Sequence, residues 1–188
     1  MKKILGLLAM VGILVCGVAA FVWSGRYNVA ANVPHWGVTH WFLEQVKDRS
    51  ISAHSKGIPV PSLKEPKLLE RGFNHYHPMC RLCHGAPGFD RNEFAKGLYP
   101  SPPDLTSGNV QQEWNDAELY WIIKNGLKLT GMPAFGVTHD DNQIWGMAAF
   151  LRNLPNLQAK KYVAMVKGIE GQQQEGKASD HRHGHTDE

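Results

Sequence analysis

The chain is poor in cysteine, balanced in charge and without any stretch of the alternating pattern of a β-strand. It has three cysteines in 188 residues, and two of them lie close together, so a zinc site would have to find its remaining ligands elsewhere. Residues 66–158 carry eight Lys or Arg and nine Asp or Glu, a net charge of −1 that offers no basic face to nucleic acid. The missing strands exclude a βαβ unit and indicate an all-helical chain.

One long apolar run lies near the N-terminus. Ile4 to Trp23 are twenty uncharged, mostly apolar residues, which as a helix span about 30 Å, the thickness of a bilayer core. Lys2 and Lys3 precede the run and place this end of the chain on the cytoplasmic side. We therefore predict a membrane anchor at residues 1–23. The alternative is a cleaved signal peptide, with Val18-Ala19-Ala20 as a tolerable cleavage site, although the apolar core of such a peptide is about 7–15 residues long.

The most informative motif is Cys80-Arg81-Leu82-Cys83-His84. Cys-x-x-Cys-His is the attachment signature of a c-type haem: the two thiols become thioethers and the histidine reaches the iron as the proximal ligand. The rival interpretations are a zinc half-site and a thioredoxin-like dithiol, and neither finds its expected context. Bacteria attach haem covalently on the outer face of the membrane. The sequence therefore predicts a single-pass protein of the bacterial cytoplasmic membrane whose haem domain lies on the periplasmic side.

Met132 is the predicted distal ligand of the haem iron. It lies forty-eight residues after His84, between Gly131 and Pro133, which favour a tight loop over a helix. A thioether is a soft, neutral ligand that raises the reduction potential. His75 and His77 are alternatives, but they are so close to Cys80 that the chain would have to turn sharply over the far face of the haem.

The haem domain is predicted to span residues 65–158. Three helices are expected: one from Pro66 into Cys80, one opening at Asn115-Asp116-Ala117-Glu118, and one beginning at Thr138 or Asp140. A glycine inside a helix costs about 1 kcal/mol relative to alanine, so Gly72 indicates the close approach of another helix. Fewer than 100 residues form a thin core, so the picture is three or four helices around one haem.

Two further segments flank this domain. Residues 24–64 are expected to form a juxtamembrane helix and a proline-containing linker, with the helix lying on the haem domain or at the membrane surface; its histidines, His35, His40 and His54, are not assigned as ligands. Residues 159–188 are expected to be a polar, disordered tail. His181, His183 and His185 in this tail are candidate ligands for copper, nickel or zinc, and the competing interpretation is a solvated tail or an added tag.

The domain resembles the class I cytochromes c, and more closely the bacterial membrane-anchored mono-haem members of that superfamily. The residues that carry the resemblance are Gly72-Phe73, Cys80 to His84, Tyr99 to Leu105, Gly131-Met132-Pro133 and the last helix with Trp145 and Leu151. The resemblance implies that the first and last helices cross at Gly72. It also implies that a proline carbonyl accepts the Nδ1 proton of His84, for which Pro102 is preferred over Pro100 and Pro103.

Together these features predict an electron carrier with one covalent haem c. Its expected partners are a membrane dehydrogenase, a quinol-oxidising complex or a terminal oxidase. Two other classes stay open: a peroxidase-like haem enzyme, if Met132 is not a ligand, and a metal-handling or redox-sensing protein that uses the histidine tail.

Overall fold

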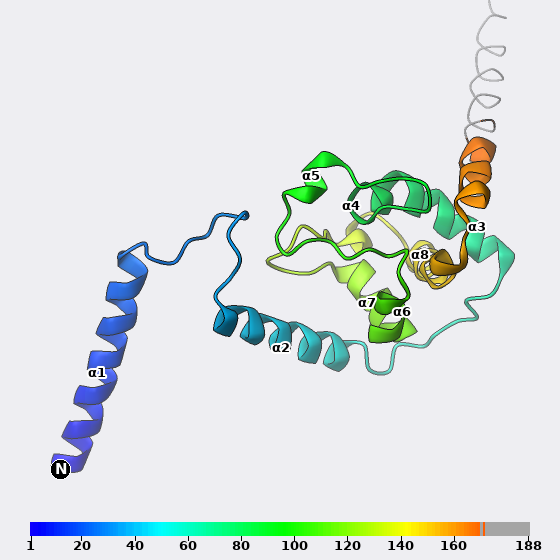
Figure 1. The fold of residues 1–188 in the computed structure, drawn as a ribbon. Coiled ribbons are helices and arrows are strands. Elements are labelled where there is room, and N and C mark those ends of the chain that lie inside the picture. The colour runs from blue at the N-terminus through cyan, green and yellow to red at the C-terminus, as the bar shows by residue number, and fades with distance from the viewer. Residues whose placement is uncertain (170, 172–188) are drawn as a thin grey trace, which may run out of the picture. The chain divides into compact units, whose positions relative to one another are not determined.

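The computed structural model describes residues 1–169 and 171 and is all-helical in that part of the chain (Figure 1). The predicted all-α fold is confirmed. The elements are α1 (Lys2–Trp23), α2 (Gly37–His54), α3 (Pro66–His75), the π-helical turn η1 (Tyr76–Cys80), α4 (Arg81–His84), α5 (Glu93–Lys96), α6 (Gly108–Glu113), α7 (Asp116–Asn125), the 3₁₀ turn η2 (Phe135–Val137), α8 (Asp141–Asn153) and the 3₁₀ turn η3 (Leu154–Asn156). Residues 159–169 are also helical. The chain divides into two compact units, residues 1–34 and residues from 35 onward.

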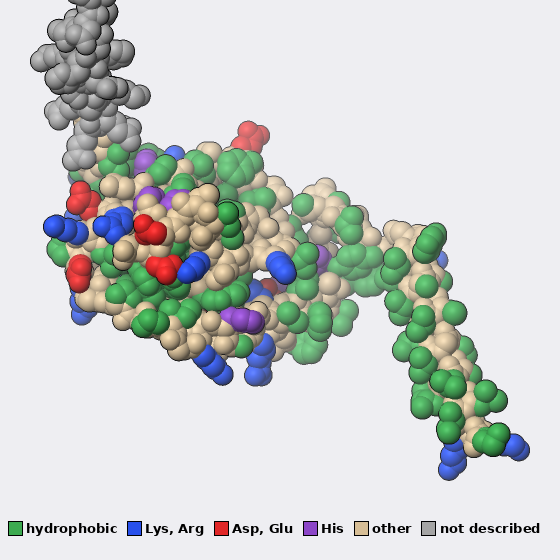
Figure 2. All heavy atoms as spheres, turned by 180° about the vertical axis from the view of Figure 1, so that it is seen from behind, with side chains coloured by type: hydrophobic (Ala, Val, Ile, Leu, Met, Phe, Trp, Pro, Cys, Tyr) green, Lys and Arg blue, Asp and Glu red, His purple; other side chains and the backbone are tan. Residues whose placement is uncertain are grey.

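The first unit is dominated by α1, a 22-residue helix with no buried residue. Hydrophobic side chains cover this helix, and lysines lie only at its N-terminal end (Figure 2). It is long and apolar enough to cross a membrane. A signal sequence at the same place meets the same criteria. The helix therefore fits a single-pass anchor.

The second unit is built on the crossing of α3 and α8 at two glycines. A Cβ atom on Gly72 would lie 2.0 Å from the carbonyl oxygen of Gly146 and 2.7 Å from the Cβ of Phe150. Only residues without side chains allow two backbones to come this close. The sequence-based explanation of Gly72 is therefore confirmed by the contact with α8.

The helices α7 and α8 begin where the capping patterns predicted. The Asn115 side chain accepts a hydrogen bond from the Glu118 N–H, and the Glu118 carboxylate accepts one from the Asn115 N–H. Asp140, rather than Thr138, forms the same reciprocal pair with Gln143 at the start of α8. Each arrangement satisfies two N–H groups that the first helical turn leaves unpaired.

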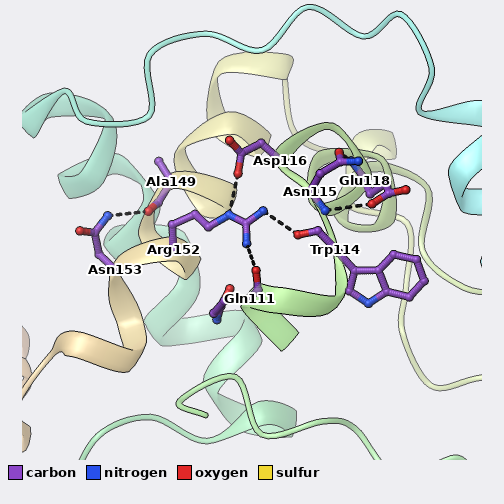
Figure 3. Close-up of polar contacts among 8 residues, drawn as sticks. All are labelled: Gln111, Trp114, Asn115, Asp116, Glu118, Ala149, Arg152 and Asn153. Atoms are coloured by element: carbon purple, nitrogen blue, oxygen red, sulfur yellow. Dashed lines mark hydrogen bonds and ion pairs between the residues drawn. The ribbon is translucent and has the colours of Figure 1, made fainter. Parts of the chain in front are cut away.

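Arg152 joins the end of α8 to the junction between α6 and α7 (Figure 3). Its Nε donates to Asp116 Oδ1 at 2.6 Å, and its two terminal nitrogens donate to the carbonyl oxygens of Gln111 at 2.6 Å and Trp114 at 2.7 Å. The planar guanidinium presents its donors in a fixed fork, so one side chain fixes three positions of the α6–α7 corner.

We expect Arg152→Ala to lower the free energy of unfolding by about 2 kcal/mol, because hydrogen bonds to a charged donor contribute about 1.5–3 kcal/mol and two carbonyls lose their partner. Chemical denaturation of the holoprotein measures the change. Arg152→Lys keeps the charge but not the fork, so it should recover only part of the loss. Full recovery by lysine would show that charge alone matters at this site.

The juxtamembrane helix α2 belongs to the second unit and contacts α7. Ile51 is buried, and the rings of His54 and Trp121 lie 5.7 Å apart. At the start of the unit, the His35 N–H donates to the hydroxyl of Tyr99 at 3.0 Å. The segment predicted to be juxtamembrane thus packs partly on α7, within the predicted haem domain.

The structure places the end of the packed domain later than the predicted residue 158. Tyr162 is fully buried and Val166 is buried, both in the helical segment 159–169. The Tyr162 ring contacts the rings of Phe73 and Phe89, and its hydroxyl lies 3.0 Å from His77 Nδ1. The expected tail therefore begins with a helix that completes the core. His181, His183 and His185 lie outside the described residues.

Candidate functional site

The Cys80–His84 motif lies at the end of a continuous helical path. The α3 helix passes into η1, a π-helical turn that ends at Cys80, and α4 then carries Cys83 and His84. Tyr76 is fully buried in η1, and its hydroxyl donates to the carbonyl oxygen of Gly85 at 2.8 Å. This bond ties the residue just after the motif to the turn before it. Single π-helical turns frequently occur at functional sites.

The two thiols of the motif are free in the structure. Desolvation raises the pKa of Cys80 to about 12, with the neighbouring Cys83 acting in the same direction. Desolvation also raises the pKa of Cys83. Both groups are therefore protonated near neutral pH in the folded chain, and neither has the low pKa of a catalytic thiol. This result disfavours the thioredoxin-like interpretation.

His84 is oriented by a carbonyl oxygen of the proline-rich loop. Its Nδ1 lies 2.8 Å from the Pro103 oxygen, so Nδ1–H donates and Nε2 carries the free lone pair. Burial lowers the pKa of His84, while the hydrogen bond to Pro103 acts in the opposite direction. The ring is therefore neutral near pH 7, the form that binds a metal.

The prediction that the Pro102 carbonyl accepts the His84 proton is wrong, because the structure has Pro103 in that role. The Pro102 carbonyl oxygen accepts a hydrogen bond from Arg91 Nη1 at 2.8 Å and is therefore engaged elsewhere. Successive carbonyls of an extended chain point in different directions, so only one of the two can meet His84. Asp104, the next residue, accepts two hydrogen bonds from Thr106 and turns the chain directly after Pro103.

Met132 is held in a loop that its own neighbours fix. Its N–H donates to Thr130 Oγ1 at 3.1 Å, and its carbonyl accepts from the Leu127 N–H at 3.2 Å. The Thr130 hydroxyl in turn donates to the Leu127 carbonyl at 2.8 Å. The methionine side chain is half-buried and packs against the core. The predicted tight loop is present, and it is closed by hydrogen bonds.

Glycines on either side allow this loop to lie against the rest of the domain. Gly126 follows α7 with a φ of +64°, and a Cβ there would lie 2.7 Å from the Met132 oxygen. A Cβ on Gly131 would lie 2.9 Å from the side chain of Leu98. The end of α7 and the segment after α5 therefore enclose the loop. Thr130 had no distinctive signal in the sequence, because a threonine beside glycine is common in any loop.

The other histidines of the second unit lie in surroundings that differ from that of His84. His77 packs between aromatic rings and contacts Tyr162, as described above. The His75 ring makes an edge contact with His139 on the far side of α3, with centroids 5.0 Å apart. His54 lies against Trp121, and His35 against Tyr99. His40 is exposed on α2.

The donor set fits haem c in its chemistry. Two unpaired thiols stand three residues apart, one neutral imidazole has its Nδ1 already engaged, and one thioether sits in a fixed loop. Cys80 and Met132 both pack against the hydrophobic core, which suits an apolar macrocycle. The helical fold and this donor set define a c-type cytochrome domain, a class that works by haem-based electron transfer.

Residues 67–151 match the sequence model of the family described as cytochrome C oxidase, cbb3-type, subunit III. This segment, from α3 to α8, is therefore a domain of the class I c-type cytochromes, as the resemblance predicted. The match includes the Cys80–His84 motif and Met132 and leaves α1, α2 and residues after 151 outside. A comparison with curated proteins found no match.

Proposed function

We propose that this protein is a membrane-anchored electron carrier with one covalent haem, attached through Cys80 and Cys83 and ligated by His84 and Met132. The observation that carries the proposal is the 2.8 Å hydrogen bond between His84 and Pro103, which leaves the Nε2 lone pair free for iron. When bound, the haem supplies an iron that alternates between Fe(III) and Fe(II).

The residues of the chain have separate tasks in this proposal. His84 donates a fixed, neutral nitrogen, and Pro103 determines the orientation of its ring. Met132, held in a loop closed by hydrogen bonds, would supply a thioether as the second protein ligand of the iron, which would leave no site for a substrate. A neutral thioether and an apolar surrounding favour the less charged, reduced iron. The protein accordingly passes single electrons and makes or breaks no bonds of a substrate.

The apolar helix and the family match support the proposed location and partners. The apolar helix α1, with lysines at its N-terminal end, supports a single-pass orientation with the haem domain on the periplasmic side of a bacterial cytoplasmic membrane. The matched family is described as a subunit of cytochrome C oxidase, which favours a terminal oxidase over a membrane dehydrogenase or a quinol-oxidising complex as the partner.

Covalent attachment is tested on the full-length protein produced in cells that attach haem. After denaturing electrophoresis, haem should stay with the wild-type chain and leave the Cys80→Ala/Cys83→Ala double variant. Cys16→Ala removes the third cysteine, which lies in α1, and should retain the haem as the wild type does. Loss of haem from the wild type on denaturation would contradict covalent attachment.

Ligation is tested by the optical spectra of the oxidised and reduced holoprotein. We expect a low-spin, six-coordinate spectrum that does not change when cyanide or peroxide is added. A high-spin spectrum that changes with either reagent would contradict histidine–methionine ligation. It would instead favour the peroxidase-like enzyme.

A further inference from the structure

Three of the four charged side chains of α2 lie on the face that packs against the protein. Glu44, Lys47 and Asp48 are half-buried on that face. Lys47 Nζ lies 2.6 Å from Glu44, 3.5 Å from Asp48 and 5.7 Å from the ring centre of Trp114. Lys47 thus forms ion pairs with both carboxylates within the unit. A surface helix of a soluble domain normally has its charged residues outward and its apolar residues inward, an arrangement that α2 follows at the buried Ile51 but not in its N-terminal half.

The opposite face of α2 is apolar and exposed in its N-terminal half. Val38 is 68% exposed, Trp41 62%, Phe42 57% and Val46 50%. Positions 38, 41, 42 and 46 follow helical spacing and form one continuous strip. We call this strip, together with Arg49 one turn further on, the outer face of α2. Hydrophobic side chains gather over this half of the helix (Figure 2).

The connection to α1 keeps the outer face within reach of the membrane. Thirteen residues, 24–36, separate the two helices, and a fully extended chain of that length spans at most about 45 Å. If α1 crosses the bilayer, α2 therefore begins no further than about 45 Å from its surface, so its outer face can reach the membrane. Tryptophan is the side chain most typical of the membrane–water interface, and Trp41 lies in the middle of the strip.

The charges of α2 distinguish a lipid surface from an apolar protein partner. Arg49 is exposed on the outer face, and Lys56 is exposed just beyond the helix. Both acidic residues of α2, Glu44 and Asp48, lie on the inner face beside Lys47. An apolar, aromatic strip that is followed by cations and free of carboxylates is complementary to anionic headgroups above acyl chains.

We propose that the outer face of α2 binds an anionic lipid bilayer at the boundary between headgroups and acyl chains. This binding holds the haem domain in one orientation on the membrane, whereas α1 alone would leave it free to turn on the linker. The proposal rests on the proposed role of α1 as an anchor, which supplies the proximity.

The test uses nitroxide labels on the full-length, reduced holoprotein in nanodiscs that contain anionic and zwitterionic lipids. The first label is placed at position 42 by Phe42→Cys in a Cys16→Ala background. A matched label replaces Glu70, an exposed polar residue of α3. Power saturation then compares collisions with oxygen, which concentrates in lipid, and with a nickel chelate, which stays in water. Haem spectra verify that each variant is folded.

We expect the label at position 42 to favour oxygen and the label at position 70 to favour nickel. Adding Arg49→Gln should lower the ratio of embedded to water-exposed label at position 42 about fivefold, the effect of one cation at an anionic surface. Equal nickel access at the two positions would overturn the proposal. A label at position 42 shielded from both reagents would also overturn it, because the strip would then be covered by protein.

A label on the native Cys16 of α1 tests the anchor separately. Oxygen access at Cys16 combined with nickel access at position 42 would leave the anchor intact and reject the role of α2. Nickel access at Cys16 would instead reject the anchor. The two failures are therefore distinguishable in one set of samples.

Discussion

We expect Gly72→Ala to lower the free energy of unfolding by about 3 kcal/mol or more, at the upper end of the range for overpacked cores. The effect is large because the added methyl group would meet backbone atoms, which cannot move aside as a side chain can. The added Cβ would lie 2.0 Å from the Gly146 carbonyl oxygen, so α3 and α8 would have to separate. A loss of this size is a large part of the stability of a small domain. Denaturation curves, together with the yield of folded holoprotein, measure it.

Gly108→Ala is the matched control for this prediction. Gly108 is also a helical glycine, at the start of α6, but nothing lies within 4 Å of a Cβ placed there. Its replacement should leave stability unchanged or raise it slightly, since alanine is the better helix former. If both variants lost stability equally, the close crossing of α3 and α8 would not be the cause.

Replacement of Met132 by alanine should have the largest effect on the redox properties. In the proposed ligation the Met132 thioether would stabilise the reduced iron, and axial ligands tune haem potentials over about 0.8 V, so we expect a fall of about 0.1 V or more. The spectrum should lose the far-red band of methionine–iron ligation, and the variant should bind cyanide. Redox titration and cyanide titration measure these changes.

Met165→Ala is the control for a general effect of losing a methionine. Met165 is half-buried in the helical segment 159–169, outside the predicted ligand set. The Met165→Ala variant should keep the wild-type haem spectrum and reduction potential. Retention of the methionine band in Met132→Ala would show that another group ligates the iron.

Local signals in the sequence were enough to place most of the helices. The pattern Asn115–Glu118 specifies a helix start because both hydrogen bonds form within four residues, and the structure shows both. Gly72 indicated a close helix crossing, because a glycine inside a helix lowers helix stability and close packing of another helix is the simplest compensation. Cys80 to His84 encode their chemistry in five consecutive residues, independent of the fold.

The remaining features depend on contacts between distant segments. Three prolines fall within positions 100–103, and the sequence does not show which of their carbonyl oxygens accepts the His84 proton. In the structure Arg91 binds the Pro102 oxygen, and the Pro103 oxygen accepts from His84. The segment after residue 158 was predicted to be a disordered tail because of its polar residues, and only its packing shows that Tyr162 and Val166 belong to the core. The inner and outer faces of α2 became distinguishable only once the position of Trp114 was known.

The contact between α3 and α8 also sets the order in which the domain can form. The two glycines that meet are Gly72 and Gly146, so α3 cannot form its crossing with α8 until nearly the whole domain has left the ribosome or the export channel. The Cys80–His84 motif begins at the last residue of η1, which follows α3, so the motif emerges well before α8. Under the proposed function, the attachment site for haem is therefore complete in the chain before this helix crossing can form.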